Sequence, residues 1–459
     1  MASAAEQLAS NMSLGAFGKA KELQKRILFT LFILIIYRIG TYIPVPGVNV
    51  DAVSDILNAS GANTPDGQGT GGGLLSRMNM FAGGAIERMA IFALNVMPYI
   101  TASIIMTLMK GSVGSLKELD KDGEQGRKQI NQYTRYLTVF FAAFQAFGIA
   151  RLLESQNLVY NPGLFFEATA VITLVGGTMF LMWLGEQITA RGIGNGVSLI
   201  ILAGIIAELP NAIFYTLNLQ REGSLSSTLI MLVLIVAIGL TLLIVYVERA
   251  QRRLLVQYPK RQVAGGKMFG GDSSFLPLKL NAAGVIPPIF ASALLMLPAT
   301  AGAYFVTSGP GWVRRMLTFI GYGQPAYFVL YGALIVFFCF FYVPYVFKPE
   351  DTADNLRQHG GFLPGIRPGA RTAEYMSYVL NRLTFIGAIY VAFVCILPAY
   401  IVAQNGSIPP SVQILIGGMS LLIIVSVTLD TVAQIQSHLV AHQYEGLIKK
   451  SRMGRRRGK

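Results

Sequence analysis

Residues 229–247 read LIMLVLIVAIGLTLLIVYV, an almost wholly apolar run without a charged side chain. A helix needs roughly 20 mostly apolar residues to cross a hydrocarbon core about 30 Å thick. This stretch therefore predicts a transmembrane helix. Nine further stretches of the same kind occur in the chain, which indicates a polytopic membrane protein.

The ten predicted spans cover residues 27–43, 89–109, 137–152, 168–184, 197–213, 229–247, 280–298, 327–347, 383–402 and 412–429. Composition agrees, because 53% of the 459 residues are hydrophobic and only 13% are charged, whereas soluble domains carry about 25% charged residues. Several spans are short for a full crossing. We expect their polar flanks to lie at interfaces or inside the protein.

The 37 Lys and Arg residues are concentrated in the two tails and in the loops after the second, fourth, sixth and eighth spans. Cytoplasmic loops of membrane proteins carry an excess of these residues, so both termini are predicted to be cytoplasmic. Basic residues in the C-terminal tail, including Arg455, Arg456 and Arg457, fit the same bias. Because the polar residues 1–26 precede the first span and no small-residue cleavage pattern follows it, no cleavable signal peptide is predicted.

An odd number of spans in each half has a topological consequence. We expect a cytoplasmic tail at 1–26, an N-terminal half at 27–220, a C-terminal half at 221–430 and a basic cytoplasmic tail at 431–459. Five spans in each half make the second half enter the membrane from the opposite side. The predicted fold is therefore all-α, with ten transmembrane helices in two pseudo-symmetric inverted halves, whose working site is expected between them near the midplane.

A glycine-rich segment before the second span is the least helix-like part of this region. Glycines are dense in residues 61–73 and recur at Gly83 and Gly84, and the short half-apolar piece 74–81 lies between them. That piece is too short to span a bilayer. It is either an interfacial loop or a re-entrant element, which is allowed only where it is buried or lines a cavity.

Few charged residues lie inside the spans, and this bears on the class of protein. Arg38 is expected to reach the interface or to pair, and Lys279, Glu186 and Asp430 lie near cytoplasmic ends. The alternative function, an ion-coupled multi-span solute transporter with inverted repeats, should show intramembrane ion ligands. These residues do not form such a site.

Enzymatic chemistry is not indicated either. The three histidines lack metal-ligand spacing, and Cys339 and Cys395 lie in apolar spans, where reduced structural thiols are expected. No phosphate-binding glycine-rich loop with a lysine is present. We expect no catalytic residues, no metal and no cofactor, so any transport work must be supplied by a partner.

Two long loops predicted to be cytoplasmic cover residues 248–275 and 348–382. Loops of this length are more often functional than simple connections. Their basic residues could attract anionic lipid, enforce topology, or bind a large acidic partner such as RNA or an ATPase surface. Their prolines and glycines favour a shaped protrusion.

The middle of several spans is aliphatic. Val96 and Ile100 are four residues apart around Pro98, so we expect them on one face of a bent helix. Aliphatic side chains in spans usually face lipid or other helices, and composition alone does not assign them to a pore.

Eight short motifs along the chain are more specific than any hydropathy pattern. They are MFAGG (80–84), MPYI (97–100), QYTRY (132–136), MWLGEQIT followed by RGIGNG (182–196), GVIP (284–287), TADNL (352–356), PGIRPG (364–369) and QYE (443–445). Through these motifs the chain resembles the SecY family of protein-conducting channels along nearly its whole length.

The resemblance implies a central hourglass pore between the two halves, sealed by an apolar ring and blocked by a short re-entrant plug helix. The implied ring is Val96, Ile100, Ile201, Ile286, Leu294 and Ile423. The implied plug is Leu74, Leu75, Ser76, Arg77, Met78, Asn79, Met80 and Phe81. An apolar constriction excludes water and ions by dewetting, yet deforms around a passing side chain.

A lateral gate is implied between the second and third spans and the seventh and eighth, with Thr107 and Asn195 as polar gate residues. Through it, apolar segments of signal-sequence-bearing polypeptides would reach the lipid bilayer. The implied function is a channel for unfolded secretory polypeptides in the bacterial inner membrane.

The family's partners are implied by the same resemblance. They are the membrane subunits SecE and SecG, the SecA ATPase and the ribosome. Contacts with the ATPase or the ribosome are expected at Arg253, Lys260, Arg261 and Arg367, of which Arg367 is expected to couple the motor to the channel.

Overall fold

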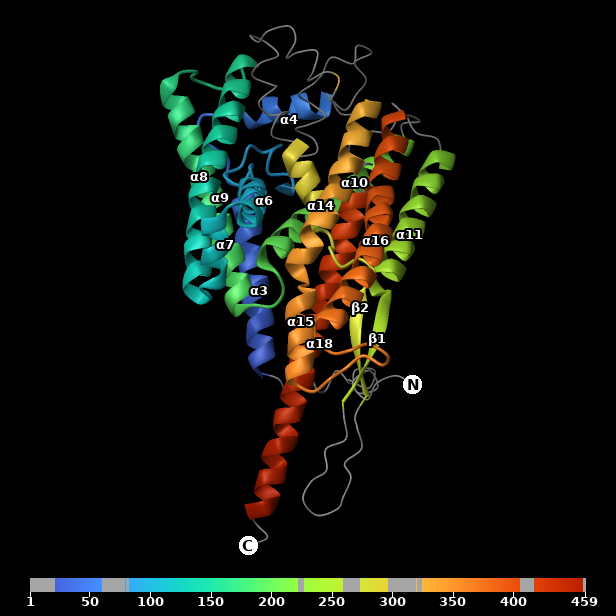
Figure 1. Cartoon of the computed structure of the whole chain (residues 1–459). Coiled ribbons are helices and arrows are strands. Elements are labelled where there is room, and N and C mark those ends of the chain that lie inside the picture. Colours follow the sequence, from blue (N-terminus) through green and yellow to red (C-terminus); the bar gives the residue numbers. More distant parts are fainter. Residues whose placement is uncertain are drawn as a thin grey trace, which may run out of the picture. The chain divides into compact units, whose positions relative to one another are not determined.

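The computed structural model describes residues 21–59, 79, 82–221, 227–258, 273–295, 319, 324–404 and 417–456, and most of them are helical (Figure 1). Within these ranges, seven helices are long and apolar enough to cross a membrane. They are α8 (Glu124–Ser155), α9 (Leu164–Arg191), α10 (Gly196–Arg221), α11 (Ser227–Arg249), α14 (Pro325–Val346), α16 (Ala370–Gln404) and α18 (Gly418–Arg456). They coincide with the predicted third to sixth and eighth to tenth spans, which confirms a polytopic helical membrane protein.

The other three predicted spans correspond to shorter or less apolar helices. The first is α3 (Lys21–Gly40), the second is α6 (Met97–Ser112), and the described part of the seventh is the helix Ile286–Leu295. The tenth helix is longer than predicted, because α18 continues without interruption through the basic tail to Arg456.

The predicted start of the second span at Met89 was wrong. Residues 83–96 form consecutive turns, and α6 begins only at Met97. Met89 and Asn95 have positive φ angles of 39° and 50°, a left-handed conformation that a right-handed helix cannot contain. Pro98 lies in the first turn of α6, where no backbone N–H is needed. It therefore starts the helix and does not bend it.

A small sheet, which we did not predict from the sequence, begins in the loop predicted at 248–275 and ends at Lys279. Strands β1 (Gln251–Gln257) and β2 (Ser273–Lys279) pair antiparallel, with Leu254 opposite Leu276. Alternate side chains of an antiparallel pair point to opposite faces, and Leu254, Val256 and Leu278 are the buried ones. Three short helices complete the described elements, namely α4 (Val50–Ala59), α7 (Gly114–Lys121) and α15 (Pro349–Gln358).

The chain divides into two compact units. The first contains the residues up to Phe214 and those from Ile423 onward, and the second contains Tyr215–Ala299 and Gly311–Leu422. In the first unit α8 packs along both α6 and α9 (Figure 1). Ala142, Ala146 and Ala150 of α8 are fully buried at four-residue spacing, and such small side chains on one helix face allow close helix contact.

In the second unit α14 packs along α16, and α15 also packs against α16. The rings of Phe328 on α14 and Tyr400 on α16 meet edge to face with centroids 5.7 Å apart. Gly418, the first residue of α18, lies directly against the carbonyl group of Val394 on α16. Only a residue without a side chain permits that approach.

The same kind of contact holds the buried turns of the first unit. A Cβ atom on Gly177 of α9 would overlap the carbonyl oxygen of Ile91, whereas a Cβ atom on the adjacent Gly176 would meet nothing within 4 Å. Replacing each of these two adjacent glycines by alanine therefore separates the effect of steric overlap from the effect of helix propensity.

We predict that Gly177→Ala lowers the free energy of unfolding by about 1–3 kcal/mol, because the added methyl group overpacks the contact with Ile91. Gly176→Ala is the matched control and should be neutral or stabilising by up to about 1 kcal/mol. Thermal unfolding in detergent micelles measures both. Equal midpoints for the two variants would contradict the close contact.

Candidate functional site

The segment that follows the predicted plug is a compact, buried set of turns. Gly83 and Gly84 have φ angles of 62° and 77°. A Cβ atom on Gly83 would lie 2.9 Å from the Cα atom of Gly204 on α10, so the two backbones touch. Glycine is required at Gly83 for both reasons, its left-handed conformation and the close approach of α10.

Asn79, the one described residue of the predicted plug, is bonded to these turns. Its side-chain Oδ1 accepts hydrogen bonds from the backbone N–H groups of Ile86 (3.1 Å) and Glu87 (3.0 Å). Its backbone carbonyl accepts one from Gly84 at 3.0 Å. Asn79 and the turns at residues 83–96 are thus joined by hydrogen bonds.

Helix α3 holds the turns from another side. The Tyr37 hydroxyl donates to the Ala82 carbonyl at 3.4 Å, and Nη1 of Arg38 donates to the Gly83 carbonyl at 2.8 Å. Arg38 was expected to reach the interface or to pair, and it pairs. Its guanidinium also donates to the Tyr42 hydroxyl at 3.0 Å.

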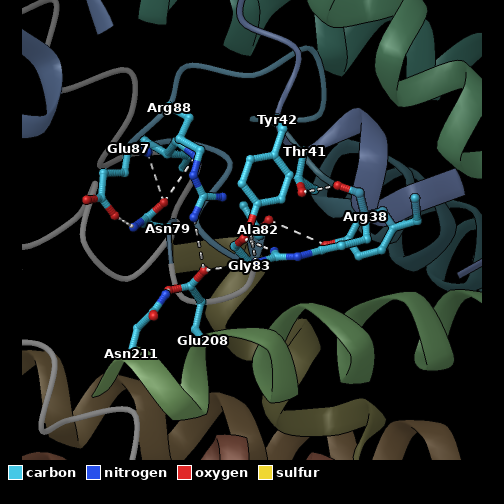
Figure 2. A network of polar contacts seen from close by, with 12 residues as sticks. Arg38, Thr41, Tyr42, Asn79, Ala82, Gly83, Glu87, Arg88, Glu208 and Asn211 are labelled. Atoms are coloured by element: carbon cyan, nitrogen blue, oxygen red, sulfur yellow. Dashed lines mark hydrogen bonds and ion pairs between the residues drawn. The ribbon is translucent and has the colours of Figure 1, made fainter. Parts of the chain in front are cut away.

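A charged residue that sequence reasoning missed completes this region. Glu208 lies on α10 within the predicted fifth span, and its Oε1 is 3.9 Å from Nη2 of Arg38 and 3.8 Å from Nη2 of Arg88. Figure 2 shows Glu208 facing both arginines, with the Tyr42 ring beside them. The only sequence signal was a lone carboxylate in an apolar span, which is rare enough to suggest a buried partner.

The residues of the predicted apolar ring occupy defined positions. Val96 is the residue before α6, Ile100 is in its first turn, Ile201 is on α10 and Ile423 is on α18. All four belong to the first unit and are buried, with exposed fractions of 5% or less. Ile286 and Leu294, in the helix Ile286–Leu295 of the second unit, are half-buried.

The two predicted gate residues make local contacts. The Thr107 hydroxyl donates to the carbonyl of Ser103 one turn earlier on α6. Asn195 precedes α10, where its Oδ1 accepts a hydrogen bond from the N–H of Ser198 at 3.4 Å. It therefore caps the start of that helix. Their role in a gate stays a prediction.

Most of the predicted plug, residues 74–78 with Met80 and Phe81, lies outside the described residues, as do Lys260 and Arg261. Arg253 is exposed on β1, and Arg367 is exposed in the loop before α16.

The two loops predicted to be cytoplasmic pack together in the second unit. Gln257 at the end of β1 and Phe362 exchange two backbone hydrogen bonds, of 2.9 and 3.0 Å. Leu254 and Leu278 of the hairpin form one apolar cluster with Leu363, and Ile366 packs against it. This packing supports a shaped protrusion, and Arg367 projects from it beside Ile366.

Within the described residues, no group of three or more His, Cys, Asp or Glu side chains is arranged to hold a metal ion. Cys339 and Cys395 are free and buried, as expected for structural thiols in apolar spans.

Comparison with known proteins identifies the family. The SecY family model matches residues 90–432. The chain is 48% identical over 440 residues to the protein translocase subunit SecY of Rickettsia bellii, covering 95% of this chain and 98% of the relative. It is 46% identical over 443 residues to the protein of the same name in Escherichia coli K12, covering 95% of this chain and 96% of the relative.

Solved structures agree on the fold. A structure described as that of a protein conducting channel matches with a TM-score of 0.63 at 18% identity, covering 90% of this chain and 92% of that one. Sec61 from a canine ribosome-channel complex matches with a TM-score of 0.59 at 19% identity, with the same coverage. These findings support the predicted protein-conducting channel and not the alternative of a solute transporter. The chain belongs to the SecY family, and the two relatives named above are protein translocase subunits.

Proposed function

We propose that this chain forms the channel through which unfolded secretory polypeptides cross the bacterial inner membrane, and from which membrane-protein segments leave sideways into lipid. The observation that carries the proposal is identity of nearly one half, over almost the whole length, to translocase subunits. The multi-pass helical fold fits a membrane channel. Both termini are proposed to face the cytoplasm, from the distribution of Lys and Arg.

The seal of the resting channel is proposed to be the ring of Val96, Ile100, Ile201, Ile286, Leu294 and Ile423. Burial of four of these aliphatic side chains supports the role, since an apolar constriction excludes water and ions without binding the polypeptide specifically. The segment Leu74 to Phe81 is proposed to be the plug that reinforces it. Thr107 and Asn195 are proposed to tune the lateral gate.

The energy for transport is proposed to come from partners. The relatives are named as translocase subunits, and similar structures include a channel bound to a ribosome. We propose that the SecA ATPase or a ribosome docks on the protrusion formed by the two packed loops, and that SecE and SecG join the chain in the membrane. The chain itself is proposed to carry out no catalysis.

Ile201→Ser tests the seal. The substitution replaces a buried butyl side chain by a small polar one, which allows water to enter the constriction. The resting ion conductance of vesicles that contain the translocase should therefore rise severalfold. Ile206→Ser is the matched control, because Ile206 lies on the same helix with an exposed fraction of 46%. Wild-type conductance of a correctly assembled Ile201→Ser variant would remove this residue from the seal.

Arg367→Glu tests motor coupling. Reversing this exposed charge at a docking surface replaces attraction by repulsion, so ATP-driven transport of a secretory precursor should fall on the order of tenfold or more. The protein should remain in the membrane in normal amounts. Arg371→Glu provides the control, because Arg371 is also exposed and only forms a loose pair with Glu374 at 3.8 Å. Equal transport by the two variants would refute a specific role for Arg367.

A further inference from the structure

Three segments far apart in the sequence bring their charges together around one carboxylate. Glu208 of α10 has a side-chain exposure of only 9%, and it faces Arg38 of α3 and Arg88 of the buried turns (Figure 2). The turns are thereby linked through charge to both helices. A buried carboxylate in a membrane protein is costly without a cationic partner, so this arrangement favours the conformation in which all three meet.

The charges in this group are not balanced. Two guanidinium groups face one carboxylate, and both also lie over the Tyr42 ring, with Arg38 4.9 Å and Arg88 4.3 Å from its centroid. The ring offers cation–π attraction to both arginines. Without the Glu208 charge, the two arginines would repel one another, and the turns would lose their ionic contact with α10.

The attraction is Coulombic rather than a tight hydrogen-bonded pair. The arginine nitrogens lie 3.8 and 3.9 Å from Glu208, and within the described residues its Oε1 and Nη1 of Arg88 are buried without a hydrogen-bond partner. By contrast, Arg135 and Glu186 form a hydrogen-bonded pair, with one contact of 2.6 Å. A longer ion pair holds the segment in place without fixing its geometry, which suits a contact that opens and closes again.

Backbone contacts tie the position of the turns to this charge. Gly84 lies so close to Glu208 that a Cβ atom would overlap the carboxylate oxygen, and Arg38 also binds the Gly83 carbonyl. Any displacement of the turns from α10 therefore separates Glu208 from Arg88. The carboxylate would then keep Arg38 of α3 as a cationic partner but lose Arg88, in a medium of low dielectric constant where losing a partner charge is strongly disfavoured.

We infer that Glu208 is a positioning residue of the resting channel, whose carboxylate holds the turns after the proposed plug against α10 and so keeps the channel closed. The inference rests on the proposed function. Its physical core is the contact of one buried carboxylate with Arg38 and Arg88.

The test uses the complete translocase in lipid vesicles and measures ion leak without a precursor polypeptide. Glu208→Gln keeps the size of the side chain and removes its charge, so the leak should rise by about tenfold, since losing a buried ionic contact shifts a two-state equilibrium by at least this factor. Glu186→Gln is the matched control, because it removes a carboxylate of α9 that is paired with Arg135 of α8. It should leave the leak unchanged.

A double variant separates the charge effect from general damage. In Glu208→Gln with Arg88→Gln the repulsion between Arg38 and Arg88 is also gone, so the leak should be smaller than in Glu208→Gln alone. A leak in the double variant that equals the sum of the two single effects would overturn the ionic contact.

Assembly of each variant is checked by its amount in the vesicles and its thermal midpoint. If Glu208→Gln does not assemble, Arg88→Gln replaces it, because it removes the charge that the turns contribute to the contact. A wild-type leak in whichever of these two variants assembles overturns the inference. Absence of precursor transport by the wild-type translocase would instead refute the proposed function, so the two failures are distinguishable.

Discussion

Backbone N–H and C=O groups that are removed from water must find hydrogen-bond partners inside the protein. In the first unit, this requirement determines the structure of the turns at residues 83–96 and of the helices around them. The left-handed residues of these turns exclude a helix, so their hydrogen bonds go elsewhere. The N–H of Ala90 donates to Ala85, that of Ile91 to Ile43, and that of Val45 to Met89. Irregular backbone at membrane depth is tolerated only where protein buries it. Glycines at the surrounding contacts, Gly177 on α9 and Gly204 on α10, allow the helices to approach closely enough.

Once the turns are enclosed, the chemistry of their surroundings follows from burial. Buried carbonyl groups need donors: the Ala82 carbonyl accepts from Ala85 within the turns and from Tyr37, and the Gly83 carbonyl accepts from Arg38. A guanidinium drawn inward in this way brings a positive charge with it, and a carboxylate on the neighbouring α10 compensates for it. The ionic contact at Glu208 is therefore a consequence of satisfying backbone groups, and not an isolated feature of a hydrophobic helix.

Hydropathy predicted the number and order of the membrane helices because apolar length is nearly the only requirement for crossing a bilayer. It placed the second span too early because residues 89–96 are apolar apart from Asn95, whether they form a helix or turns, and hydropathy does not register the positive φ angles of Met89 and Asn95. Hydropathy marks Glu208 only as a lone carboxylate in an apolar span, because its partners come from distant parts of the chain and are recognisable only in three dimensions. The β1–β2 hairpin was missed because its basic residues were interpreted as evidence of a cytoplasmic loop. The alternation of buried and exposed side chains that would indicate a strand, with Leu254 and Val256 buried, covers only a few residues. The positions of the proposed seal came from family resemblance, because aliphatic side chains that line a pore and those that pack a core are chemically alike.

The order of residues along the chain explains how a charge could control an apolar seal. The turns that Arg88 anchors to Glu208 end at Val96, and α6 begins at the next residue, with Ile100 in its first turn. No flexible linker separates the charged contact from these two proposed seal residues. The intervening backbone is instead bonded to the segment that follows α3, through Ile43 and Val45. A displacement of the turns is thus transmitted directly to Val96, because a buried, hydrogen-bonded segment moves as a unit and packed interiors do not absorb it by gradual deformation. An apolar ring closes around any polypeptide, but its side chains do not by themselves favour the closed conformation over an open one. An ionic contact that breaks when the turns move lowers the free energy of the closed conformation and so gives the seal a preferred resting state.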